Sequence, residues 1–160
     1  MCTSKWICYF KYLMLLAVFA GMSVFAQSGN INREKFDPTK NPSEDLKIAV
    51  KTATAENKRI LLDVGGEWCI WCHRIDEFIE TNEDVKSSLT SAFVILKVNY
   101  SKENKNEEFL GKFPTIEGSP HFFVLENDGS LTVSQNTGDL EDGKSYSKEK
   151  FLEFVAKYKK

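Results

Sequence analysis

The sequence predicts an α/β domain with a central mixed sheet of about four strands, an antiparallel hairpin at its edge and helices on both faces. Short apolar runs at 59–64, 93–99 and 121–125 alternate with segments in which apolar residues recur at helical spacing. Such alternation favours a sheet covered by helices on both sides. The turn signal Asn127-Asp128-Gly129 predicts that 131–135 pairs antiparallel with the preceding run.

The first 26 residues have the pattern of a secretory signal peptide. Lys5 and Lys11 are their only charges, and an uninterrupted apolar run follows from Tyr12 to Ala26. The run is shorter than the roughly 20 residues that a membrane-spanning helix needs, and it ends in small or modest residues that suit a signal peptidase. We therefore expect cleavage between Ala26 and Gln27 and a periplasmic or secreted mature protein. An uncleaved membrane anchor is the alternative.

The remaining chain divides into a polar stretch at 27–40, expected to be a flexible N-terminal arm, and a single domain at 41–160. Without the signal segment, 19 of the 21 basic residues remain against 23 acidic residues, a net charge of −4. This charge gives no electrostatic case for binding nucleic acid.

The helices of the domain have recognisable ends. Asn41 is expected to cap a first helix that begins at Pro42, with Glu44 reaching back as its capping partner. A second helix is expected from Ile70, with Asn82 capping a short continuation of it. The other expected elements are a short helix near 109–113, a loop at 138–144 and a C-terminal helix from 147.

Trp68-Cys69-Ile70-Trp71-Cys72-His73 is the most informative stretch of the chain. Two cysteines separated by two residues are compatible with dithiol redox exchange, with c-type haem attachment through C-x-x-C-H, or with half of a metal site. Cleavage of the signal segment would remove Cys2 and Cys8, so Cys69 and Cys72 would be the only cysteine pair of the mature protein. One pair is too few for a fold held together by disulfides.

Haem and zinc are the weaker alternatives. Haem iron often takes Met as a further ligand, and all three Met residues lie within the first 26 residues. A zinc site would need His73 and His121 beside the two cysteines, a spacing that matches no common finger. We therefore expect no metal and no organic cofactor.

The position of the pair favours thiol chemistry. Cys69 is expected at the start of a helix, where unsatisfied N–H groups and the helix dipole stabilise a thiolate and make it the nucleophile. Cys72 lies one turn later and could resolve a mixed disulfide from within.

Residues 63–72, Asp-Val-Gly-Gly-Glu-Trp-Cys-Ile-Trp-Cys, resemble the active-site strand and turn of the thioredoxin family. Asp63 matches the family's buried Asp, and Lys97 matches the Lys near it. Ser119-Pro120 matches the segment that holds the family's cis-proline, which faces the disulfide. The resemblance covers roughly 44–158. The stretch 72–76, followed by Asn82-Glu83-Asp84-Val85, is similar to the C-terminal thioredoxin-like domain of the bacterial thiol–disulfide interchange protein.

The resemblance implies an exported thiol–disulfide oxidoreductase that acts on protein disulfides and is recharged by a membrane or periplasmic redox partner. In that reading Asp63, expected to be buried with a raised pKa, serves as a proton relay for Cys72. The substrate would contact Trp68, Trp71, Ser119 and Pro120. Ile70-Trp71 replaces the Gly-Pro of ordinary thioredoxin, a change that bears on redox potential. We expect a monomer.

The main alternative to an oxidoreductase is a non-catalytic binding module. Trp68, Trp71 and the Pro120 loop could form an apolar groove that binds a partner or acts in a chaperone-like way. Turnover of a disulfide substrate would separate the two functions.

Overall fold

The computed structural model describes residues 34–160. The expected signal peptide lies outside the described residues, as does 27–33 of the expected arm. The helices are α2 (Pro42–Glu56), α3 (Ile70–Thr81), α4 (Glu83–Ala92), α5 (Glu107–Leu110) and α6 (Lys148–Tyr158), with a 3-10 helix η1 (Thr137–Leu140). The strands are β1 (Arg59–Gly65), β2 (Phe93–Asn99), β3 (His121–Leu125), β4 (Leu131–Asn136), β5 (Glu141–Asp142) and β6 (Ser145–Tyr146).

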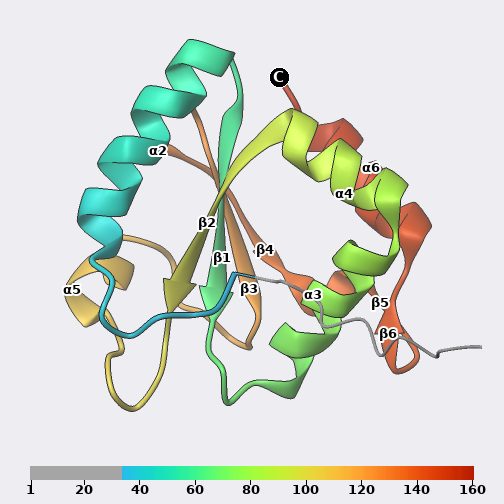
Figure 1. Ribbon diagram of the computed structural model, residues 1–160, viewed down its shortest axis with the longest axis horizontal. Helices are drawn as coiled ribbons and strands as arrows, with labels where there is room; N and C mark the ends of the chain where they lie inside the picture. Colours follow the sequence, from blue (N-terminus) through green and yellow to red (C-terminus); the bar gives the residue numbers. More distant parts are fainter. Residues whose placement is uncertain (1–33) are drawn as a thin grey trace, which may run out of the picture. The chain divides into compact units, whose positions relative to one another are not determined.

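Four strands form the central sheet in the order β2-β1-β3-β4. β1 pairs parallel with β2 and antiparallel with β3, and β3 pairs antiparallel with β4. This is the mixed sheet with an antiparallel edge hairpin that the sequence predicts. Helices α2 and α5 lie on one side of the sheet and α3, α4 and α6 on the other (Figure 1).

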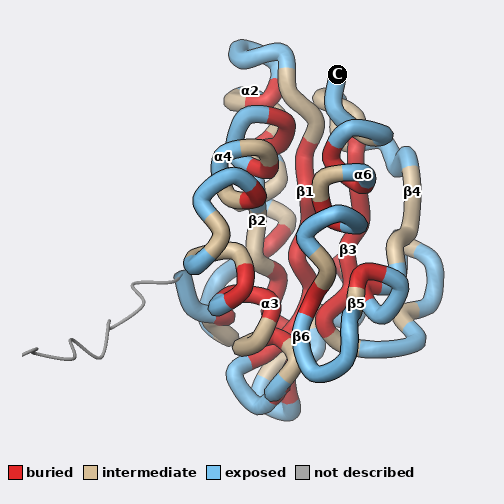
Figure 2. Tube along the Cα trace, turned by 90° about the vertical axis from the view of Figure 1, so that its right-hand side faces the viewer, coloured by how far each residue is buried: buried red, intermediate tan, exposed pale blue. Residues whose placement is uncertain are grey.

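Strand β1 is the buried centre of the domain, as Figure 2 shows. Its side chains alternate between two cores: Ile60, Leu62 and Val64 pack with α2 residues, whereas Leu61 packs with residues of α3, α4 and α6. Burial on both faces explains why the strand reads as a continuous apolar run. Asp63 falls on the same face as Leu61, because successive side chains of a strand point to opposite faces.

The observed helix ends differ from the expected capping in two details. The Asn41 side chain accepts hydrogen bonds from the backbone N–H groups of Ser43 and Glu44, as a cap should. However, Glu44 pairs with Lys47 at 2.8 Å. Asn82 does occupy the N-cap position of α4, but its side chain makes no capping hydrogen bond, because its amide donates to the carbonyl of Phe78 at 2.7 Å.

The segment expected as a loop at 138–144 contains regular structure. η1 leads into the small hairpin β5–β6, whose turn places Gly143 at a φ of 59°. Tyr146 anchors this hairpin because its side chain is buried against α3 and α6, next to Phe78 and Phe151. Within 34–160, no helix has both the length and the apolar character needed to cross a membrane.

Candidate active site

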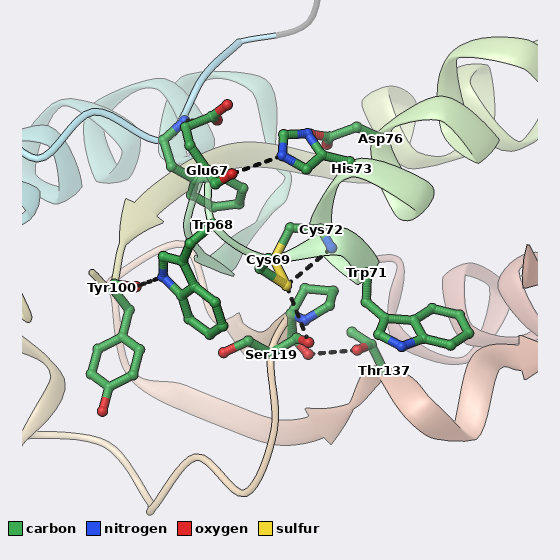
Figure 3. Close-up of a disulfide and its surroundings, with 12 residues drawn as sticks. Glu67, Trp68, Cys69, Trp71, Cys72, His73, Asp76, Tyr100, Ser119 and Thr137 are labelled. Carbon is green, nitrogen blue, oxygen red and sulfur yellow. Dashed lines mark hydrogen bonds between the residues drawn. A yellow bond between two sulfur atoms is a disulfide. The ribbon is translucent and has the colours of Figure 1, made fainter. Parts of the chain in front are cut away.

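Cys69 and Cys72 lie at the start of α3 and are joined by a disulfide (Figure 3). Their Cα atoms are 5.2 Å apart. Cys69 is the N-cap residue of α3, and its sulfur accepts a hydrogen bond from the backbone N–H of Cys72 at 3.1 Å. A thiolate on Cys69 would therefore sit at the positive end of the helix dipole. Cys72 is the deeper of the two, at 1% exposure.

The Ser119-Pro120 segment faces Cys69 from the start of β3. The Cys69 sulfur lies 3.4 Å from the carbonyl oxygen of Ser119, and the Ser119–Pro120 peptide bond is cis. The hydroxyl of Thr137 donates to the carbonyl of Pro120 at 2.5 Å, which holds this turn against η1. Contact between this turn and a substrate stays a prediction.

Trp68 forms the exposed side of the site. Its side chain is 62% exposed, and its indole N–H donates to the carbonyl of Tyr100 at 2.8 Å. Gly66 makes this position possible, because a Cβ there would lie 2.5 Å from the indole nitrogen. Trp68 and Tyr100 line a groove of about 490 Å³ whose other wall is the loop of Ser101–Lys105. Trp68 and Tyr100, which line the groove, lie on one side of the disulfide (Figure 3).

Trp71 lies on the opposite side of the disulfide from Trp68 (Figure 3). Its ring packs edge-on against Tyr146, with a centroid distance of 5.9 Å, and the Arg74 guanidinium lies 4.4 Å from its centroid. The Trp71 carbonyl also accepts a hydrogen bond from the Tyr146 hydroxyl at 3.4 Å. These contacts tie the start of α3 to the β5–β6 hairpin. Contact between Trp71 and a substrate stays a prediction.

Asp63, Lys97 and Asp76 form a buried charged cluster under the start of α3. Asp63 and Lys97 are paired in the β1–β2 register, and the Lys97 ammonium lies 3.1 Å from Asp63 Oδ2 and 2.6 Å from Asp76 Oδ1. The side chain of Lys97 is only 9% exposed. Burial alone would lower the pKa of the Lys97 ammonium, but the two carboxylates outweigh it and raise that pKa.

One carboxylate oxygen of Asp63 lacks a hydrogen-bond donor among the described residues. Its Oδ1 is buried and has no hydrogen-bond partner among residues 34–160. A buried oxygen without a partner is costly unless it meets a donor during function. Asp63 lies in β1, the strand that leads into the Cys motif. Its role as a proton relay for Cys72 stays a prediction.

Sequence reasoning missed two residues at the site. Asp76 pairs with Lys97 because it lies one turn after Cys72 on the inner face of α3. Phe36 is buried at 2% exposure and packs with both cysteines, although it belongs to the polar stretch expected to be a flexible arm. Asp76 could have been found from its i+4 spacing to Cys72. For Phe36 the only signal is a lone aromatic residue in a polar segment.

The two histidines have different hydrogen-bond partners. His73 Nε2 is 2.9 Å from the carbonyl oxygen of Glu67, and His121 Nε2 is 2.8 Å from the hydroxyl oxygen of Ser134. His121 is buried, and the loss of solvation lowers the pKa of its imidazole. In the described part of the chain, no three His, Cys, Asp or Glu side chains are grouped so that they could hold a metal ion.

The fold and the Cys pair define a class of protein. Residues 41–127 match the thioredoxin-like family, so the chain belongs to that family.

Two curated relatives share a name. The thiol:disulfide interchange protein DsbD of Actinobacillus pleuropneumoniae serotype 5b (strain L20) is 27% identical over 92 residues, which cover 57% of this chain and 16% of that protein. The DsbD of Pseudomonas sp. (strain JR1 / K1) is 23% identical over 130 residues, covering 80% of this chain and 22% of that protein. The chain thus spans about a sixth to a fifth of the length of the curated relatives that it matches.

Solved structures show the same fold. A disulphide isomerase from Xylella fastidiosa Temecula1 superposes with a TM-score of 0.67 at 22% identity, covering 79% of this chain and 97% of that one. The reduced C-terminal domain of DsbD from Neisseria meningitidis gives a TM-score of 0.54 at 22% identity, covering 73% of this chain and 96% of that one.

Proposed function

We propose that the protein is a thiol–disulfide oxidoreductase that acts on protein disulfides. The Cys69 thiolate attacks a substrate disulfide, so that one sulfur of the substrate becomes bonded to Cys69 and the other leaves as a thiolate. The Cys72 thiolate then attacks Cys69 Sγ, which closes the Cys69–Cys72 disulfide and releases the second substrate thiolate. The substrate is thereby reduced by two electrons and the protein oxidised by two.

One observation carries this proposal: Cys69 caps α3 while Cys72 lies buried behind it, within disulfide distance. A helix N-terminus stabilises the thiolate of the attacking residue, and a deeper second thiol is placed to resolve the intermediate. Asp63 supports the second step, because its unpartnered oxygen can accept the proton that Cys72 must lose. Trp68, Ser119 and Pro120 supply the surface that the substrate meets.

We propose reduction as the net direction. Asp63 and Asp76 place two carboxylates around one ammonium beneath the dithiol. The excess negative charge of this cluster disfavours a thiolate on the nearby cysteines. Because the reduced dithiol is then less stable relative to the disulfide, the protein becomes a stronger reductant. A potential measured against glutathione should then lie nearer to that of thioredoxin, about −270 mV, than to that of DsbA, about −120 mV.

Export and a recharging partner complete the proposal. The apolar run that ends at Ala26 and the likeness to DsbD both support a periplasmic or secreted protein. A reductase in an oxidising compartment must itself be reduced, so we propose a membrane or periplasmic partner as its electron donor.

Trapping tests the assignment of the two cysteines. The Cys72→Ser variant should accumulate mixed disulfides between Cys69 and substrate proteins, because nothing resolves them. These adducts should run as dithiothreitol-sensitive bands on non-reducing gels. The Cys69→Ser/Cys72→Ser double variant is the control and should form none. Failure of Cys72→Ser to trap any substrate would contradict the resolving role.

A further inference from the structure

Phe36 lies in the short segment that leads into α2, and it is packed against the active site. Its ring belongs to one buried cluster with Cys69 and Cys72, and it is 2% exposed. The same ring covers the Lys97 ammonium, which lies 4.1 Å from the ring centroid. One side chain therefore touches both the dithiol and the charged cluster beneath it.

The contact with Cys72 is close. A Cβ built on Gly65 would lie 2.5 Å from the Cys72 sulfur and 2.9 Å from Cζ of Phe36. The sulfur and the ring thus converge on the same glycine at the end of β1. No space is left there for a larger side chain, and the ring lies beside Cys72 in the same buried cluster.

Polar contacts hold the segment in place. The backbone N–H of Phe36 donates to Glu67 Oε1 at 3.0 Å, and the side chain of Asn104 donates to the carbonyl of Pro38 at 2.9 Å. Glu67 belongs to the β1–α3 connection and Asn104 to the β2–α5 connection. The segment is therefore fastened to both loops that border the site.

We propose that Phe36 is a positioning residue that seals Cys72 from solvent, so that external thiols and disulfides meet Cys69 alone and Cys72 reacts only within the molecule. This inference rests on the proposed oxidoreductase function. It adds a residue that reserves attack on the substrate for Cys69 and resolution of the mixed disulfide for Cys72. A sealed Cys72 is also kept from irreversible oxidation, which follows thiolate exposure.

Alkylation of Cys72 tests the seal. In a Cys69→Ser background the only thiol in the described chain is Cys72, and iodoacetamide modification of that residue can be followed by peptide mass spectrometry. With Phe36 present the reaction should be slow, because alkylation requires an accessible thiolate. Phe36→Ala should accelerate it by about tenfold or more, and Phe36→Leu, which keeps most of the cover, should restore the slow rate.

Phe154→Ala is the matched control, since it removes a buried ring of α6 outside the cluster of Phe36 and the two cysteines. It should leave alkylation slow. Equal rates in Phe36→Ala and its parent, or the same acceleration in Phe154→Ala, would overturn the proposal. If Phe36→Ala does not fold, Glu67→Ala removes the carboxylate that holds the Phe36 N–H and should accelerate alkylation by a smaller factor; an unchanged rate would then overturn the proposal.

The assay needs no redox turnover. A failed seal therefore appears as rapid alkylation in the presence of Phe36, whereas failure of the oxidoreductase function appears as absence of disulfide reduction by the wild type. The two results are independent.

Discussion

Lys97 sets the balance of charge beneath the dithiol. It reaches Asp63 on the neighbouring strand and Asp76 on α3, and all three side chains are less than a tenth exposed. A buried ion pair contributes little net stability compared with apolar residues, but loss of one partner leaves an uncompensated charge. Lys97 therefore holds two elements together while it neutralises part of the charge that the cysteines experience.

Removal of that ammonium gives a stability prediction. Lys97→Met should lower the free energy of unfolding by about 3–5 kcal/mol, because two buried carboxylates then face each other without a cation. Urea denaturation followed by circular dichroism measures the change. Adding Asp76→Asn to Lys97→Met should recover part of the loss. A Lys97→Met protein as stable as the wild type would show that the cluster is not a buried ion pair in solution.

His121 gives a prediction about pH. Burial lowers the pKa of its imidazole in the folded state, so the unfolded chain takes up this proton more readily. The stability that neutral His121 contributes is full above the ordinary histidine pKa of about 6.5 and is lost as the pH falls below it towards the folded-state pKa. The free energy of unfolding should thus decrease between pH 7.5 and pH 5, and His121→Gln should show a smaller decrease. Urea titrations at both pH values test this, and an identical decrease in the variant would refute it.

At the scale of single residues, register and spacing determine what sequence can predict. Asp63 and Lys97 could be placed together only through the resemblance to the thioredoxin family, and the β1–β2 register pairs them. Phe36 could not, because nothing in a polar segment indicates which loop it will cover. Its partners, Gly65 and Cys72, are distant in sequence and come together only after the sheet has formed.

Helix ends decide how the elements are joined to the site. α2 begins where Asn41 accepts two backbone N–H groups, immediately after the segment that carries Phe36. The start of this helix therefore fixes the end of the Phe36 segment. Cys69 is likewise the N-cap residue of α3, and its sulfur accepts a hydrogen bond from the backbone N–H of Cys72.

Capping of α2 can be tested with a matched pair of variants. Asn41→Ala should lower the free energy of unfolding by about 1 kcal/mol, because two N–H groups at the helix start lose their acceptor. Asn41→Asp keeps a capping oxygen and should be close to neutral. Chemical denaturation measures both. A similar loss in the two variants would mean that the cap does not stabilise the helix.

Among the elements, those with an apolar run, a helical period or a turn signal were predicted, and the short polar β5–β6 hairpin was not. β1 and β3 are buried on both faces, so their apolar runs identify them directly. The β5–β6 hairpin has only two residues in each strand and no apolar alternation. Asp142-Gly143 is a turn signal that could have indicated it. Its stability depends on Tyr146 reaching the aromatic cluster of α3 and α6, which is a tertiary contact.

On the scale of the whole domain, the sheet brings together residues from five separated segments. The segment before α2, β1, the start of α3, β2 and the Ser119-Pro120 turn each provide one part of the site. The thioredoxin-like fold is what places a helix N-terminus, a buried carboxylate and a proline turn around one disulfide. This arrangement is the physical basis for the redox chemistry that we propose for Cys69 and Cys72.

Reduction of insulin disulfides is the most direct test of that assignment. With dithiothreitol as the electron donor, the wild-type protein should accelerate insulin precipitation, and Cys69→Ser should reduce the rate to that of dithiothreitol alone. Folding of both proteins is checked by circular dichroism. A folded wild-type protein that gives no acceleration with any reductant, or a Cys69→Ser variant as active as the wild type, would contradict the account.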